Sequence, residues 1–139
     1  MASGCTFCWL KKKLMNEIFS QSVENLVIKI KNSELTSVEL CEKYIERIDQ
    51  FEKEVKAWAF FDKKILLEKA KQADDYRRSG KPIGFLHGIP VAVKDIIGTV
   101  DMPTECGTSI RKGKSYSQNA EIIDLLISEG AIVMGKTAT

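Results

Sequence analysis

Lys94 is the residue whose type and position most strongly suggest chemistry in this sequence. It follows Pro90-Val-Ala-Val93, a run of small and β-branched residues that is typical of a strand buried on both faces. A lysine buried there must be paired, neutral or functional, and a neutral lysine can accept a proton from a nucleophile. The sequence is equally compatible with a strand that ends at Val93, so that Lys94 extends into solvent.

Two stretches match the spelling of phosphate-binding motifs without their structural context. Residues 130–137, GAIVMGKT, fit the pattern G-x-x-x-x-G-K-[ST]. Four consecutive apolar residues, however, occupy the positions that form a flexible phosphate cradle in a P-loop. Val91-Ala-Val-Lys94 resembles the lysine-bearing strand of protein kinases, but the glycines at positions 80, 84 and 88 lack the G-x-G-x-x-G-x-V spacing that such a strand requires. A P-loop NTPase or a kinase fragment is therefore a weak alternative.

The other groups with catalytic or metal-binding side chains are isolated in the sequence. His87 is the single histidine, and its place before Gly-Ile-Pro favours a structural hydrogen bond over a catalytic role. Cys5 and Cys8 have C-x-x-C spacing, but a structural zinc site needs further ligands and a redox pair should open a helix after a strand. We interpret them as ordinary thiols, and the run Lys11-Lys12-Lys13 as a solvated helix face.

Hydrophobic periodicity predicts alternating helices and strands. Helices are expected at about 14–31 in one or two segments, at 36–52 with a Thr36 and Glu39 capping box, at 62–79 before Gly80, and at 120–129. Strands are expected at 57–61, 90–93 and 131–134, with a long polar loop at 98–117. This alternation predicts an α/β sheet covered by helices.

The residues around Lys94 resemble the amidase signature family. The resemblance rests on FLHGIPVAVKD at 85–95 and DMPTECGT at 101–108. It extends in family order through SVEL at 37–40, a helix at 70–80 and GAIVMGKT at 130–137, and so covers about residues 35–139. Ile96, Asn119 and Thr108 stand where Asn, Asp and Ser are commoner in the family, which bears on subfamily and substrate more than on membership.

This resemblance implies a fold and a domain organisation. Residues 35–139 would be the N-terminal portion of an α/β/α domain with a mixed sheet covered by helices, and residues 1–34 a helical extension before it. The family's serines lie in a G-S-x-x-G-G-S stretch downstream of Gly-Lys-Thr, so we expect a domain truncated before that stretch. In that case residues 131–134 would be an apolar, unpaired edge strand that favours aggregation.

The resemblance also implies a mechanism that needs no metal or organic cofactor. Lys94 would take a proton, through one serine, from a second serine, which attacks a carboxamide carbon to form an acyl-enzyme. The segment Gly107-Thr-Ser-Ile110 lacks the paired glycines whose N–H groups could form an oxyanion hole, so we expect this chain alone to be inactive.

The loop after the lysine strand is the second candidate element, because long loops after strands often line sites in α/β folds. Thr104, Cys106, Gly107 and Thr108 are candidates for the substrate pocket. Such polar residues are equally common in surface turns, where they only satisfy the backbone.

Composition excludes several classes of protein. Hydrophobic residues make up 44% of the chain and charged residues 29%, which is ordinary for a globular domain. The net charge of +2 gives no reason to expect a nucleic-acid partner, and the sequence lacks a run of about 18 apolar residues that would suggest a membrane span. We expect a cytoplasmic protein. The resemblance to the amidase signature family implies a small amide substrate, and a protein that acts as a homo-oligomer or with amidotransferase partner subunits. The alternative class is a noncatalytic module, or gene remnant, that binds a partner through its apolar N-terminal helices.

Overall fold

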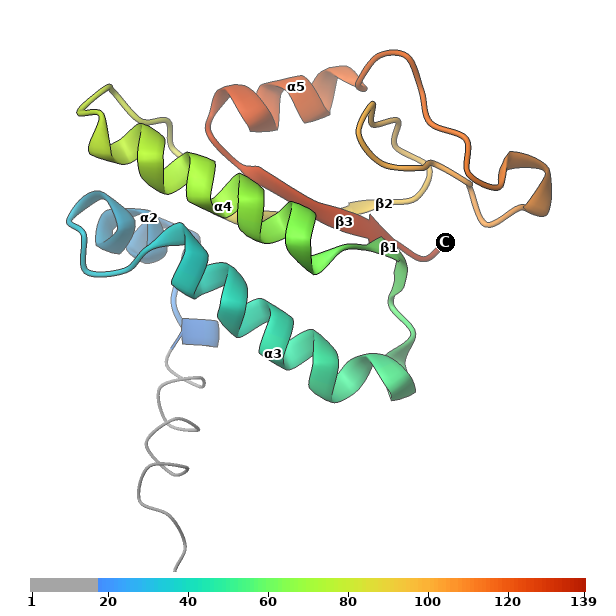
Figure 1. Cartoon of the computed structure of the whole chain (residues 1–139), viewed down its shortest axis with the longest axis horizontal. Helices are drawn as coiled ribbons and strands as arrows, with labels where there is room; N and C mark the ends of the chain where they lie inside the picture. The colour runs from blue at the N-terminus through green and yellow to red at the C-terminus, as the bar shows by residue number, and fades with distance from the viewer. Residues whose placement is uncertain (1–17) are drawn as a thin grey trace, which may run out of the picture.

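The computed structural model describes residues 18–139, and Figure 1 shows how their helices and strands are arranged. Cys5, Cys8 and Lys11-Lys12-Lys13 lie outside the described residues. The elements are α2 (Val23–Lys31), α3 (Ser37–Val55), β1 (Trp58–Phe61), α4 (Lys63–Arg78), β2 (Pro90–Lys94), a 3-10 turn (Ser109–Arg111), α5 (Glu121–Ser128) and β3 (Ile132–Thr137). The expected alternation of helices and strands is confirmed, and β3 is longer than expected because it continues through Lys136 and Thr137.

The three strands form one mixed sheet in the order β1-β3-β2. β2 and β3 are parallel, with Lys94 opposite Thr137. β1 is antiparallel to the C-terminal half of β3, with Phe61 opposite Gly135. The expectation that residues 131–134 form an unpaired edge strand is therefore wrong, because β3 lies between two strands that precede it in the chain. Hydrophobic patterning identifies a strand but not its neighbours.

Helices cover both faces of β3, as alternation along a strand requires. α3 and α4 lie side by side across one face (Figure 1). The core on that side contains Cys41, Leu66, Ala70, Ile132 and Met134. α5 covers the other face, and that core contains Val93, Met102, Ile123 and Val133. α2 adds a third cluster, which contains Leu26, Ile30, Leu40 and Ile89.

The N-terminus of α3 is fixed by its own residues and by α4. The expected capping box is confirmed: the Thr36 hydroxyl accepts from the Glu39 N–H at 3.0 Å, and the Glu39 carboxylate accepts from the Thr36 N–H at 2.8 Å. The buried carboxylate of Asp74 in α4 accepts from the N–H groups of Ser37 and Val38 at 2.8 and 3.1 Å. Two of the unpaired N–H groups at the start of α3 are thus satisfied by another helix.

Gly88 brings the chain that enters β2 against the same end of α3. Its φ is +76°, and a Cβ at this position would lie 2.2 Å from Ser37 Oγ. Only glycine combines this backbone conformation with so close a contact. The His-Gly-Ile-Pro segment therefore sets where β2, and with it Lys94, begins.

Candidate functional site

Lys94 is the last residue of β2 and lies beside Thr137, at the C-terminal end of the parallel strand pair. Its side chain is exposed, as is that of Ala92, whereas Val93 between them is buried. The expectation of a strand buried on both faces is therefore wrong for the described residues. β2 is an edge strand whose second face remains open, while α4 packs against β3.

Asp95 joins this end of β2 to the loop that follows it. Its N–H donates to the carbonyl of Thr137 at 3.0 Å, and its carbonyl accepts from the N–H of Cys106 at 3.0 Å. Its buried carboxylate accepts from the N–H of Glu105 at 3.1 Å. These bonds fold residues 105 and 106 back to the strand end where Lys94 lies, so one of the expected pocket residues is close to Lys94 in the fold.

The four expected pocket residues have different environments. Cys106 is half-buried and Gly107 and Thr108 are exposed. Positive φ values of 56° at Cys106 and 65° at Gly107 turn the chain at this edge of the sheet. Thr104 is instead fully buried, and its hydroxyl accepts a hydrogen bond from Lys136 at 2.5 Å. A contact between substrate and any of the four stays a prediction.

Lys136 is a buried charged residue that the sequence alone did not single out. Its side chain is fully buried, and besides Thr104 its Nζ donates to the carbonyl of Ile97 at 2.8 Å. The same Nζ lies 3.9 Å from the carboxylate of Asp95. Burial lowers the pKa of the Lys136 ammonium, and the Asp95 carboxylate opposes that change.

A β-bulge explains which face Lys136 occupies. Val91 lies opposite Val133, but the next residue of β2, Ala92, lies opposite Gly135. β3 therefore holds one extra residue at Met134, which reverses the alternation of side chains beyond it. Lys136 consequently lies opposite Val93, on the face that Val133 shares with α5. A sequence reading could have placed Lys136 in the strand from the apolar run before it, but not on this face.

His87 makes the structural hydrogen bond expected of it. The ring is buried, and its Nε2 lies 3.0 Å from the carbonyl oxygen of Ala73. Because the partner is a carbonyl oxygen, Nε2 carries the proton of this bond. His87 precedes β2, so it lies at the opposite end of that strand from Lys94.

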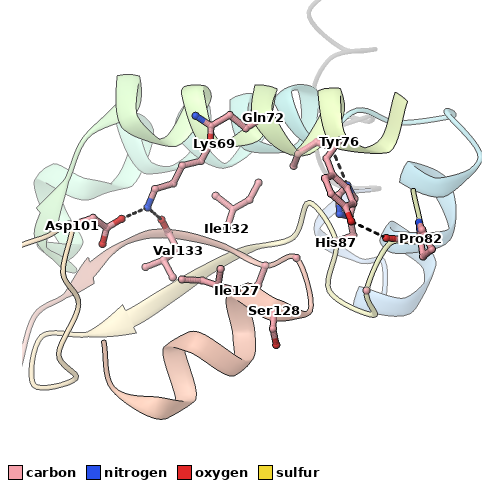
Figure 2. A pocket seen from close by; sticks show the side chains of 14 residues that line it. Lys69, Gln72, Tyr76, Pro82, His87, Asp101, Ile127, Ser128, Ile132 and Val133 are labelled. Carbon is pink, nitrogen blue, oxygen red and sulfur yellow. Dashed lines mark hydrogen bonds and ion pairs between the residues drawn. The ribbon is translucent and has the colours of Figure 1, made fainter. Parts of the chain in front are cut away.

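A groove of about 490 Å³ lies between α4 and α5, beside the N-terminal half of β3. Figure 2 shows Lys69 at one end of this groove, where its ammonium contacts the Asp101 carboxylate and the Val133 carbonyl. Neither Lys94 nor Cys106 lines the groove. Within residues 18–139, no cluster of three His, Cys, Asp or Glu side chains could hold a metal, and no helix is long and apolar enough to cross a membrane.

Comparison with known proteins identifies the family. The family model for Amidase matches residues 39–139. The chain belongs to the amidase family. Its mixed sheet covered by helices agrees with the α/β fold that the resemblance implied.

Individual members of the amidase family are similar over most of this chain. A glutamyl-tRNA(Gln) amidotransferase subunit of Chloroflexus aurantiacus is 34% identical over 122 residues, which is 88% of this chain and 25% of that protein. The solved peptide amidase of Stenotrophomonas maltophilia is 30% identical with a TM-score of 0.79, over 85% of this chain and 24% of its own. A solved amidase family protein of Bacillus anthracis is 31% identical with a TM-score of 0.78, over 97% of this chain and 27% of its own. The chain thus spans about a quarter of the length of the curated relatives it matches.

Proposed function

We propose that this chain supplies the lysine-bearing part of an enzyme that cleaves carboxamide C–N bonds, with Lys94 as the residue that transfers the proton. The observation that carries the proposal is the family match over residues 39–139, which includes Lys94 and Asp95. Lys94 lies at the C-terminal end of parallel strands, and open α/β sheets usually bind their ligands at that edge. The bonds that Asp95 makes to Glu105 and Cys106 bring a loop to the same place.

The chemistry that we propose follows from the weakness of an amide as an electrophile. The Lys94 amine takes a proton, through one serine, from the hydroxyl of a second serine. That oxygen then bonds to the carbonyl carbon, and N–H donors stabilise the oxyanion. The C–N bond of the substrate then breaks, and its amine leaves with the proton that Lys94 had taken. Water later hydrolyses the ester that joins the acyl group to the serine. In this proposal residues 35–139 are the N-terminal portion of the domain, and the two serines and the oxyanion donors come from polypeptide outside the 139 residues.

The exposure of Lys94 adds a requirement to this proposal. Removal of water from around a lysine favours the neutral amine that can act as a base. The open face of β2, which carries Ala92 and Lys94, must therefore be covered in the active protein by further polypeptide, by a partner subunit or by substrate.

We propose a small carboxamide as the substrate and the cytoplasm as the compartment. The similar proteins include both a peptide amidase and an amidotransferase subunit, so the enzyme would act either as a homo-oligomer on free amides or with amidotransferase partner subunits. Ammonia release from simple amides, compared with release from glutamine in the presence of partner subunits, distinguishes the two.

Substitution of Lys94 tests the proposal directly. In a polypeptide that joins this chain to a serine-bearing segment, Lys94→Arg keeps the positive charge but cannot deprotonate at working pH. We expect kcat for amide hydrolysis to fall about 100- to 10,000-fold, the usual contribution of general base catalysis. Lys94→Met should lose activity equally and fold at least as well. Lys112→Arg, at an exposed lysine in the following loop, is the matched control. Near-normal turnover by Lys94→Arg would show that Lys94 provides only a charge.

The 139-residue chain alone provides a second test. Assayed against aryl and alkyl amides, it should give only background hydrolysis because, in this proposal, the serine pair and the oxyanion donors belong to other polypeptide. Turnover that Lys94→Ala abolishes would contradict this and would direct attention to Ser109, an exposed serine in the 3-10 turn of the same loop.

A further inference from the structure

We propose that Lys136 is a positioning residue of this site: it fastens the loop of residues 95–104 to β3 and so fixes the sheet edge where Lys94 and Cys106 lie. The role of that edge in catalysis rests on the proposed function. The attachment of the loop to β3 does not rest on it, because it follows from contacts within this chain.

The contacts of Lys136 are those of an ammonium that holds a loop at several points. Its Nζ donates to the carbonyl of Ile97 at 2.8 Å and to the hydroxyl of Thr104 at 2.5 Å. Longer contacts reach the carbonyl of Pro103 at 3.4 Å and the hydroxyl of Thr99 at 3.5 Å. Carbonyl oxygens only accept hydrogen bonds, so the protonated form with three N–H donors matches this set. Four positions of one loop therefore converge on a single side chain of β3.

Stability alone does not account for a charge in this position. Lys136 and Asp95 have exposures of 0% and 2%, and the cost of removing such a pair from water often exceeds its attraction, so apolar replacements are commonly neutral or stabilising. Residues 95–104 form neither helix nor strand, and separate bonds hold their backbone, such as those from Thr104 N–H to the carbonyl of Lys114 at 2.8 Å and from Val100 N–H to Asn119 Oδ1 at 2.9 Å. Convergence on Lys136 adds a common point of attachment on β3.

Asp95 carries the effect from Lys136 to the candidate site. Its carboxylate lies 3.9 Å from the Lys136 ammonium on one side and accepts from the Glu105 N–H at 3.1 Å on the other. It is also the residue directly after Lys94, with its N–H bonded to Thr137 and its carbonyl to Cys106. Loss of the Lys136 ammonium would therefore release both the end of β2 and the turn at residues 105–106.

Hydrogen exchange of backbone amides in the 139-residue chain tests the fastening. Lys136→Met removes the charge but keeps most of the side-chain length. We expect amides in residues 95–108 to exchange at least 10-fold faster, while amides in α4 keep their protection. A merely structural role would lower protection in α4 as much as in the loop. The matched control is Lys69→Met, because Lys69 also binds this loop, through Asp101, but from a partly exposed position. It should change exchange in the loop less than 3-fold.

A second variant covers the case in which Lys136→Met does not fold. Thr104→Val keeps the shape of the side chain and the Lys136 ammonium but removes the nearest acceptor. We expect faster exchange in residues 95–108 with α4 unchanged. The inference is overturned if no folded variant of these two increases amide exchange in the loop more than in α4.

Turnover then separates this inference from the proposed function. In the serine-containing polypeptide, Lys136→Met should lower kcat at least 10-fold and change KM less than 3-fold, whereas Lys69→Met should change neither. Faster loop exchange with unchanged kcat would overturn the positioning role. A wild-type protein without amide turnover would instead refute the proposed function. Amide exchange in the loop would then decide by itself whether Lys136 holds the loop against β3.

Discussion

The two lysines at the C-terminal ends of β2 and β3 have opposite environments although they lie on neighbouring strands. Lys94 is exposed, whereas Lys136 is fully buried among oxygen acceptors. The bulge at Met134 contributes to this difference, because it turns Lys136 toward the face that the loop of residues 95–104 covers. The Nζ of Lys136 is therefore occupied by acceptors within this chain, whereas the side chain of Lys94 remains accessible to a ligand.

Cys41 is the residue that should make stability depend on alkaline pH. Burial, followed by the charges of Asp74 and Glu42, raises the pKa of its thiol from 9.0 to about 12. The unfolded chain loses this proton at lower pH than the folded chain, so the stability contribution is complete below pH 9 and declines as pH rises toward 12. Over a window that begins near pH 9, one proton corresponds to about 1.4 kcal/mol per pH unit.

Urea unfolding of the wild type and Cys41→Ala at pH 8 and pH 10 measures this contribution. Cys41→Ala should be less stable at pH 8, because it leaves a cavity in the core between the helices and β3. The difference between the two proteins should shrink by about 1 kcal/mol at pH 10, since only the wild type has the thiol to titrate. An equal decline in both proteins would assign the alkaline loss to other groups.

At the scale of elements, the contact between α3 and α4 through Asp74 should matter more than the local cap of α3. Asp74→Ala leaves the N–H groups of Ser37 and Val38 without their buried acceptor. We expect it to lower the free energy of unfolding by about 3 kcal/mol, because each unsatisfied buried group costs about 1–3 kcal/mol. Thr36→Ala, which removes an exposed cap, should cost only about 1 kcal/mol.

Thermal or urea unfolding of the two variants tests this order, and Asp74→Asn is the informative control. The asparagine keeps one acceptor oxygen but loses the negative charge that favours a helix N-terminus. Its stability should lie between that of the wild type and that of Asp74→Ala. A smaller loss for Asp74→Ala than for Thr36→Ala would mean that water replaces the carboxylate at this position.

The sequence predicted the positions of helices and strands better than it predicted which of them pack or pair with one another. The Thr36 and Glu39 capping box placed the start of α3, and Gly80 placed the end of α4, because both signals are local. Sequence patterns were insufficient where distant residues decide the outcome. The insertion of β3 between β1 and β2, the open face beside Lys94 and the burial of Lys136 all depend on pairings between segments far apart in the chain.

At the scale of the whole molecule, the outer face of α5 should cause the 139-residue chain to associate with itself. Ile122 and Leu125, three residues apart on one face of the helix, have exposures of 52% and 56%, and adjacent exposed apolar side chains favour association. Sedimentation velocity should show species larger than a monomer at micromolar concentration. The double variant Ile122→Glu and Leu125→Lys should shift the chain toward monomer without loss of thermal stability.

The matched control for α5 is Ile123→Glu, which places a charge at a side chain with 1% exposure. It should unfold the chain rather than convert it to a folded monomer, because an unpaired charge in a core is costly. A wild-type chain that sediments as a monomer with a sharp thermal transition would contradict the prediction. That result would favour a self-sufficient module.

The strand order also determines when the sheet can form during translation. β3 is the last of the three strands to leave the ribosome, yet it is the one to which both others bond. Until residues 132–137 emerge, β1 and β2 have no partner in this sheet, and α4, which lies between them in the chain, lacks the strand on which it packs. Contacts between segments so far apart slow folding. A pause or an early stop during translation of this region would therefore expose two bare strands to chaperones or to other nascent chains.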